Sequence, residues 1–276
     1  MINFRLYPAM TKATIPNNIQ LSSGDFSNSF YNMFNLTNSD FNHSNVTNMS
    51  RIYYYCNNLT SNPACGDNVV DMQYAYYRCF NITNSPACGN NVVSMKQAYQ
   101  ECRNLTGSPV CRNNVVDMYS AYAFCRNLTG SPMCGEKVIN MAYAYRNCFN
   151  LTGSPVCGEN VTSMVNTYAN CYNLTGSPVC GNNVTSMGYT YYGCTKLTGT
   201  MYCYNANITN FTNCFGAKNN SRRINIYVPP ASTTFESILV NNTSSIVGKN
   251  ITWSFNVACH WNTAYNIYIY PSLFAD

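Results

Sequence analysis

The chain of 276 residues has enough apolar material for a sizeable core, because 46% of its residues are hydrophobic, but only 9% are charged. Since globular domains usually carry about a quarter charged residues, Asn, Thr, Ser and Tyr must supply most of the polar surface. The formal net charge of +5 is scattered, and Arg222 and Arg223 are the only adjacent basic residues. This scatter excludes a phosphate-tracking stripe, so we expect no nucleic-acid partner.

The sequence shows neither a targeting segment nor a membrane-spanning one. Residues 1–8 lack the apolar stretch of a secretion signal, and no run approaches the roughly 20 apolar residues of a membrane helix. We therefore expect no membrane insertion and no conventional secretion. A protein that leaves its cell inside an assembled particle needs neither a targeting segment nor a membrane-spanning segment.

Residues 1–25 precede the repeats and are expected to form a cap or attachment segment. Ile2, Phe4 and Leu6 alternate with polar residues, a pattern typical of a short strand. The open end of a stack of repeats exposes apolar side chains, and a capping segment shields them from water. We expect residues 1–25 to cover that end.

Residues 26–214 repeat with a period of 23 residues, which two columns of cysteine mark. The first cysteine column comprises Cys56, Cys79, Cys102, Cys125, Cys148, Cys171 and Cys194. The second comprises Cys65, Cys88, Cys111, Cys134, Cys157, Cys180 and Cys203. Leu, Val, Met and Tyr recur with the same period. One unit is too small to bury these side chains, so they leave water only by stacking on their equivalents in the next unit.

The fold class predicted by this repetition is a repeat solenoid. Within one coil, the segment from Leu105 to Val110 is expected to be a short strand, which Pro109 shortens because it has no amide donor. The second half of a coil spaces its apolar residues by three and four, which predicts a short helix or helical turn. The predicted core of two central coils comprises Leu105, Val115, Met118, Tyr122, Cys125, Leu128, Val138, Met141, Tyr145 and Cys148.

Residues 183–194 read Asn-Val-Thr-Ser-Met-Gly-Tyr-Thr-Tyr-Tyr-Gly-Cys and are followed by Leu197-Thr198. This run resembles the BspA-like leucine-rich repeats of bacterial surface proteins, and the resemblance covers about residues 31–203. It implies a leucine-rich-repeat-like solenoid with a short strand plus a short helix or turn in each coil. It also implies attachment or recognition rather than catalysis. Where the family has a short apolar strand after Leu-Thr, this chain has Gly-Ser-Pro-Val-Cys.

The cysteines leave two alternatives open. Neighbours within one column are expected about 5 Å apart, which is within reach of a disulfide. Free cysteine is equally suited to a packed column, because it is a compact apolar residue that buries well. The Asn-x-Thr sequons, such as Asn58-Leu59-Thr60, likewise allow glycosylation or a structural ladder of hydrogen bonds along the stack.

No catalytic site, metal site or cofactor is predicted. The two histidines, His43 and His260, lie at opposite ends of the sequence, and Cys259 and His260 point apart if they share a strand. Acidic residues are scattered and suit solvated faces. Cysteine spacings of 9 and 14 differ from the knuckles of structural zinc sites.

A column of variable residues follows the first cysteine column and is the predicted ligand-binding strip. It comprises Phe80, Arg103, Arg126, Phe149 and Tyr172, between Asn57 and Thr195. Aromatic and Arg side chains about 5 Å apart suit sugar rings or a protein partner. A second variable strip comprises Tyr74, Gln97, Ser120, Tyr143, Asn166 and Tyr189. Ordinary surface drift is the alternative explanation for both.

Residues 215–276 abandon the period and are expected to form a β-rich module that caps the repeats and oligomerises the chain. Strands are predicted at Ile224–Val228, Ile251–Phe255 and Tyr265–Tyr270, which are rich in β-branched and aromatic residues. An exposed edge at Tyr265–Tyr270 favours pairing with another chain, so we expect a homo-oligomer.

Together these features predict a non-enzymatic repeat protein with a structural or adhesive role on the outside of a particle. The predicted setting is a bacteriophage virion, as a fibre or decoration protein that mediates assembly or attachment. Its expected partners are other virion or surface proteins and a host glycan or surface receptor. The alternative is a bacterial cell-surface or secreted BspA-like adhesin.

Overall fold

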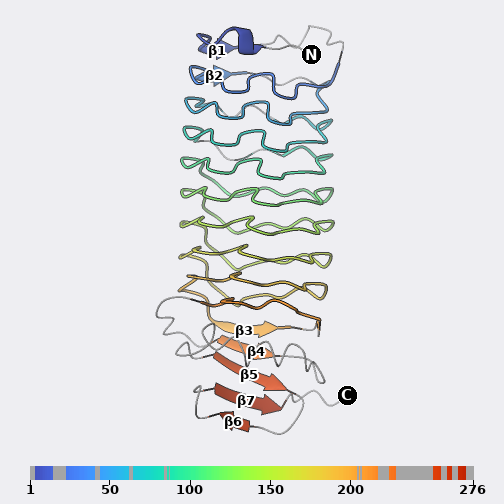
Figure 1. Ribbon diagram of the computed structural model, residues 1–276, viewed down its shortest axis with the longest axis vertical. Coiled ribbons are helices and arrows are strands. Elements are labelled where there is room, and N and C mark those ends of the chain that lie inside the picture. Colours follow the sequence, from blue (N-terminus) through green and yellow to red (C-terminus); the bar gives the residue numbers. More distant parts are fainter. Residues whose placement is uncertain are drawn as a thin grey trace.

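The structure is a computed structural model. It describes residues 4–14, 23–40, 44–61, 65–83, 86, 88–203, 205, 207–216, 224–227, 251–255, 260–262 and 267–271. The elements in these ranges are η1 (Phe4–Leu6), β1 (Lys12–Ala13), β2 (Asn38–Ser39), β3 (Gly199–Tyr202), β4 (Ile224–Tyr227), β5 (Ile251–Phe255), β6 (His260–Asn262) and β7 (Ile267–Pro271). Between β2 and β3 the chain winds into coils that stack along the long axis of the molecule (Figure 1).

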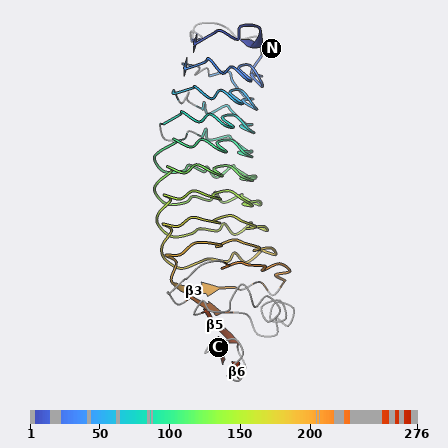
Figure 2. The same ribbon diagram turned by 60° about the vertical axis from the view of Figure 1, so that its left-hand side comes forward.

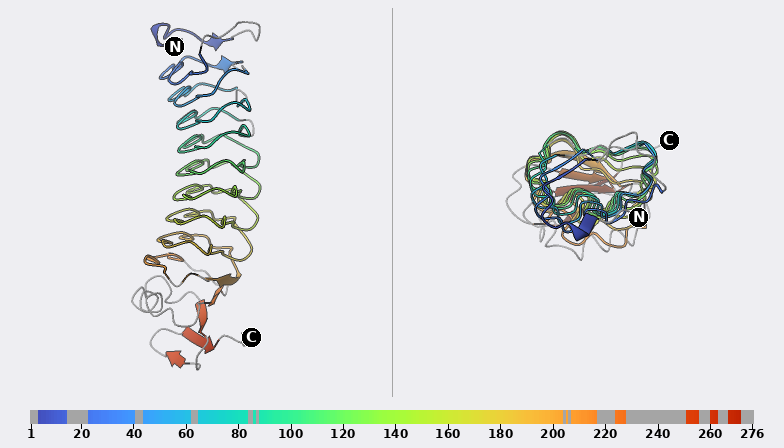
Figure 3. Two further views of the ribbon diagram at one scale, coloured as in Figure 1. Left: turned by 90° about the vertical axis from the view of Figure 1, so that its right-hand side faces the viewer. Right: turned by 90° about the horizontal axis from the view of Figure 1, so that it is seen from above.

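Successive coils are joined by parallel bridges at equivalent residues. The bridged residues are Asp25, Asn48, Asp71, Ser94, Asp117, Asn140, Ser163, Ser186 and Asn210. Figure 2 shows the same stack from another side, and the view along the axis in Figure 3 shows the coils lying over one another around a common outline. Because equivalent residues face each other, any side chain that recurs with the period forms a column along the rod.

The second half of each coil is built from consecutive turns. Alternate amides from Met72 to Arg78 donate to carbonyl oxygens of residues 94–100 in the next coil, at 2.8–3.0 Å. The amides between them donate to the carbonyl three residues earlier, and the Gln73 amide donates to Oδ1 of Asp71 at 2.8 Å. Every amide of the segment has an acceptor. In an α-helix these amides would donate to carbonyl oxygens of the helix itself and not to the next coil. The described residues contain no α-helix.

The segment from Leu105 to Val110, expected to be a strand, lies outside any strand. The carbonyl of Gly107 accepts a hydrogen bond from the Thr129 amide of the next coil at 2.9 Å. The Val110 amide instead donates to the hydroxyl of Tyr122 at 3.1 Å, and Pro109 has no amide hydrogen. The inter-coil ladder is interrupted here because two of its donors are missing.

The core is a set of columns centred on stacked aromatic rings, here called the aromatic spine. The spine comprises Phe4, Phe30, Tyr53, Tyr76, Tyr99, Tyr122, Tyr145, Tyr168, Tyr191 and Phe215, with successive ring centroids 4.8–5.7 Å apart. The ten residues predicted for the core of the two central coils have no exposed surface. Stacked pairs of this kind contribute about 0.5–1.5 kcal/mol each beyond their buried area.

The described cysteines are free thiols, and Cys259 lies outside the described residues. Cysteines of the first column donate to the preceding coil, as Cys102 Sγ does to the Tyr76 carbonyl at 3.0 Å. In the second column sulfur also accepts, as Cys111 Sγ does from the Gly135 amide at 3.1 Å. These bonds hold each sulfur against backbone.

The N-terminal end differs from the sequence prediction. Phe4 and Leu6, expected in a strand, lie in the 3-10 helix η1, and Ile2 lies outside the described residues. The Phe4 amide donates to the Ser29 carbonyl at 3.1 Å, and its ring stacks on Phe30 at 4.8 Å. The N-terminal segment is anchored both by this ring, which ends the aromatic spine, and by the parallel pairing of β1 with β2.

At the other end a five-stranded sheet continues the stack, in the order β3-β4-β5-β7-β6 (Figure 1). Strands β3, β4, β5 and β7 pair in parallel, and β6 pairs antiparallel to β7. Strands β4, β5 and β7 overlap the three predicted ones. The edge prediction is wrong, however, because β7 has a partner on both sides and the outer strand is β6; Tyr265 and Asn266 lie outside the described residues.

Candidate ligand-binding face

The side of the rod formed by the turns presents the most varied side chains. In residues 72–79, Met72, Ala75, Tyr76 and Cys79 are fully buried. The side chains between them point outward, one, two, five and six residues after each Met of the repeat. We call the surface formed by these outward residues on all coils the turn face.

The backbone of the turn face is left-handed at two places in each coil. These are the second and sixth residues after each Met, for example Tyr74 with φ 56° and Arg78 with φ 60°. A left-handed non-glycine residue costs about 1–2 kcal/mol, and the inter-coil hydrogen bonds of the same residues offset that cost. Such strain concentrates at functional sites in proteins. The second variable strip coincides with the first of these places.

A cluster of tyrosines covers the N-terminal part of the turn face. Tyr31, Tyr54 and Tyr77 stack face to face, with ring centroids 4.9 and 4.8 Å apart. The guanidinium of Arg51 lies 4.8 Å from the ring of Tyr74. Each coil therefore adds one ring to a continuous surface column, in a geometry that favours cation–π contacts.

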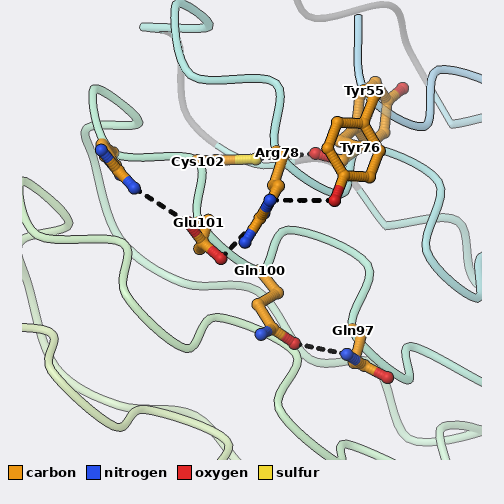
Figure 4. Close-up of polar contacts among 8 residues, drawn as sticks. Tyr55, Tyr76, Arg78, Gln97, Gln100, Glu101 and Cys102 are labelled. Carbon is orange, nitrogen blue, oxygen red and sulfur yellow. Dashed lines mark hydrogen bonds and ion pairs between the residues drawn. The ribbon is translucent and has the colours of Figure 1, made fainter. Parts of the chain in front are cut away.

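Arg78 and Glu101 form the charged centre of this cluster (Figure 4). Arg78 donates from Nε to Glu101 Oε1 and from Nη1 to the Tyr55 hydroxyl, both at 2.9 Å. The other carboxylate oxygen accepts from Arg103 Nη2 at 2.9 Å. Arg103 belongs to the ligand-binding strip, and Glu101 neutralises much of its charge. This part of the strip is less suited to an anionic ligand.

The five residues of the predicted ligand-binding strip lie on the surface in two groups. Arg103 lies over the Phe80 ring at 4.7 Å. Farther along, Arg126 lies over the Phe149 ring at 5.6 Å, and Phe149 stacks on Tyr172 at 5.2 Å. Tyr172 is 43% exposed. Within the described ranges Arg126 has no acidic partner, so the second group combines two stacked rings with an uncompensated positive charge.

A pocket of about 300 Å³ opens on the turn face two coils beyond the charged centre. It is lined by Arg146, Asn166, Ala169, Asn170, Tyr189 and Tyr192. The fifth residue after each Met forms a column that reads Tyr77, Gln100, Ala123, Arg146, Ala169 and Tyr192 along the rod. Ala123 and Ala169 are the short members of this column, and the slot lies at Ala169, between Arg146 and Tyr192. Sequence analysis missed this slot, although an alanine between Arg and Tyr in the column is a signal for it.

The buried cysteines do not suit nucleophilic chemistry. Burial raises the pKa of the Cys56 and Cys111 thiols to about 12, and it raises the pKa of Cys102 well above its usual range. A thiol of such pKa holds its proton at neutral pH, and the thiolate is the reactive form. No group of three His, Cys, Asp or Glu residues in the described ranges is placed to hold a metal ion.

Comparison with protein-family models, curated proteins and solved structures finds no match for the chain. The resemblance to BspA-like repeats therefore stays a prediction. In the part of the chain that the structure describes, no helix is long and apolar enough to cross a membrane.

Proposed function

We propose that this chain is a non-enzymatic adhesive rod of leucine-rich-repeat-like architecture, which presents aromatic and Arg side chains to a glycan or surface receptor on the outside of a particle. The observation that carries the proposal is the second group of the ligand-binding strip. There Arg126, Phe149 and Tyr172 from three successive coils form one exposed surface. Rigid aromatic and Arg residues of this kind dominate the energetics of recognition surfaces.

The architecture supports this role because the inter-coil hydrogen bonds fix the backbone beneath the strip. A rigid surface loses little conformational entropy when a ligand binds, which leaves more of the contact energy as affinity. The low content of charge suits contact with a neutral or weakly charged surface. Two settings fit equally, a bacteriophage virion and a bacterial cell surface, and the same rod serves attachment in either.

A glycan array probed with the purified chain tests the adhesive role. We expect Arg126→Ala and Phe149→Ala to reduce binding at least tenfold while the far-UV circular dichroism stays unchanged. Lys137→Ala is the matched control, since Lys137 is an exposed cation whose Nζ donates to Asn114 Oδ1 outside the strip. Equal binding by wild type and both strip variants would contradict the proposed role.

The setting is tested on protein from its native source. A virion component is expected at a fixed copy number in purified particles, with free thiols by intact mass after alkylation. An adhesin is expected with envelopes or medium, and disulfides or occupied sequons would support that alternative.

A further inference from the structure

We propose that the slot at Ala169 binds a single pyranose ring that carries a carboxylate, as in a uronic or sialic acid. This inference rests on the proposed adhesive function and names a second site for it, about two coils from Arg126 along the rod.

The shape follows from the column that contains Ala169. Near the N-terminus of the same column, the Tyr54 ring lies between Tyr31 and Tyr77, nearly parallel to both, with centroids 4.9 and 4.8 Å away. Arg146 and Tyr192 are likewise two coils apart, and Ala169 stands where Tyr54 stands in that stack. Arg146 and Tyr192 thus flank Ala169 as Tyr31 and Tyr77 flank Tyr54, and Ala169, at the floor of the slot, is 2% exposed. A ligand ring there would repeat the place of Tyr54.

Two polar side chains of the slot, those of Arg146 and Asn166, make no hydrogen bond among the described residues, whereas the Tyr189 hydroxyl accepts one from Asn213 Nδ2 at 3.0 Å. Arg146 Nε is buried and makes no hydrogen bond among the described residues. The Asn166 side chain makes no hydrogen bond to any described residue. Asn170, in contrast, donates from Nδ2 to Asn147 Oδ1 at 2.7 Å. Buried polar groups without partners are rare in folded proteins. A purely apolar ring would cover the Asn166 side-chain amide without compensation, while the hydroxyl groups of a sugar supply both donors and acceptors.

The charge favours an acid. The guanidinium of Arg146 lies 5.6 Å from the Tyr143 ring and 5.8 Å from the Phe124 ring, and no described carboxylate pairs with it. Held between aromatic groups, its planar fork suits bidentate contact with a carboxylate. Tyr189, which also lines the slot, is 37% exposed.

The slot is preformed in its backbone. Asn166, Asn170 and Tyr189 all have left-handed φ, at 55°, 63° and 58°. Their amides donate to the next coil at 2.6–2.8 Å, which holds the side chains in place. A site of this rigidity does not have to close around its ligand, so even a monosaccharide is expected to bind with Kd of about 1 mM, given the affinity that a dozen non-hydrogen atoms provide.

The test uses NMR titration of the full chain with sodium glucuronate, N-acetylneuraminate, methyl glucoside and 4-hydroxybenzoate. We expect the two acidic sugars to bind and methyl glucoside to bind at least tenfold more weakly. Ala169→Tyr fills the slot and is expected to abolish binding. Gln100→Tyr is the matched control, because it adds the same ring to the same column three coils away and should leave binding unchanged.

Arg146→Gln separates charge from shape and is expected to remove the preference for the acidic sugars. Three results would overturn the inference: no binding of either acid, binding that survives Ala169→Tyr, or binding of 4-hydroxybenzoate without the sugars. If the slot fails while Arg126→Ala still weakens array binding, the adhesive role stands and this site falls. If array binding is also insensitive to Arg126 and Phe149, both fall.

Discussion

The hydroxyl of Tyr122 offers the most direct test of how one half of a coil is tied to the other. The Tyr122 ring lies in the aromatic spine with centroids 5.6 Å from both Tyr99 and Tyr145. Its hydroxyl donates to the Val110 carbonyl at 2.7 Å and accepts from the Val110 amide at 3.1 Å. Tyr122→Phe keeps the ring and removes both bonds.

The expected cost follows from what Val110 loses. Its amide and carbonyl are partly buried and have no other partner among the described residues, so Tyr122→Phe should lower the free energy of unfolding by about 1–3 kcal/mol. Tyr122→Ala also removes the ring and should cost about 3–5 kcal/mol. Two lost ring pairs, worth about 0.5–1.5 kcal/mol each, place this variant at the upper end of that range.

Urea unfolding followed by circular dichroism measures these differences, and hydrogen exchange reports directly on the Val110 amide. We expect faster exchange at Val110 in Tyr122→Phe. The control is Tyr119→Phe, whose hydroxyl lies on the turn face without a described hydrogen bond and should change stability by less than about 0.5 kcal/mol. An equally small change in Tyr122→Phe, with Val110 protection intact, would refute the argument that this hydroxyl replaces the missing strand ladder.

Two further predictions concern the turns and the thiols. Gly130 has φ +78°, and an added Cβ would overlap the Ser108 side chain, so Gly130→Ala should lower the free energy of unfolding by about 1–3 kcal/mol in the same urea assay; a neutral effect would contradict the left-handed turn. Burial raises the pKa of Cys111 and Cys194 from 9.0 to about 12, so the stability gained from their protonated form is complete below about pH 9 and is lost as pH rises toward 12, at about 1.4 kcal/mol per pH unit for each such thiol. Unfolding midpoints that stay constant from pH 8 to 10.5 would show that the thiols are not buried.

Most of the features that could be predicted from the sequence follow from the 23-residue period. Residues that recur every 23 positions must face one another in stacked coils, which explains why the predicted core from Leu105 to Cys148 lies in one set of columns. The strands at β4 and β5 also follow from their β-branched and aromatic residues. These are local or periodic signals, and they do not depend on the path of the backbone between the fixed positions.

The path itself was harder to predict. Val184, Met187, Tyr191 and Cys194 have helical spacing, but consecutive turns closed by bonds three residues apart bring the same residues to one side. The turns differ from a helix in that alternate amides donate to carbonyl oxygens of the next coil. No residue type in the repeat predicts this hydrogen-bond pattern. The left-handed conformation of the Tyr, Gln and Arg residues cannot be predicted from residue type either, because the hydrogen bonds between coils impose it.

Because the stack imposes this conformation, the side chains of the turn face can vary without a change of fold. The hydrogen bonds that hold a left-handed residue join backbone to backbone, so they form whether the side chain is Tyr74, Gln97, Ser120 or Asn166. Side-chain identity at these places is therefore nearly independent of the fold, whereas a change in the spine is felt by the coils on both sides. The slot at Ala169 lies where a short residue stands between Arg146 and Tyr192 in its column. If the proposed site exists, single substitutions on the turn face can create or remove it without any change in the core.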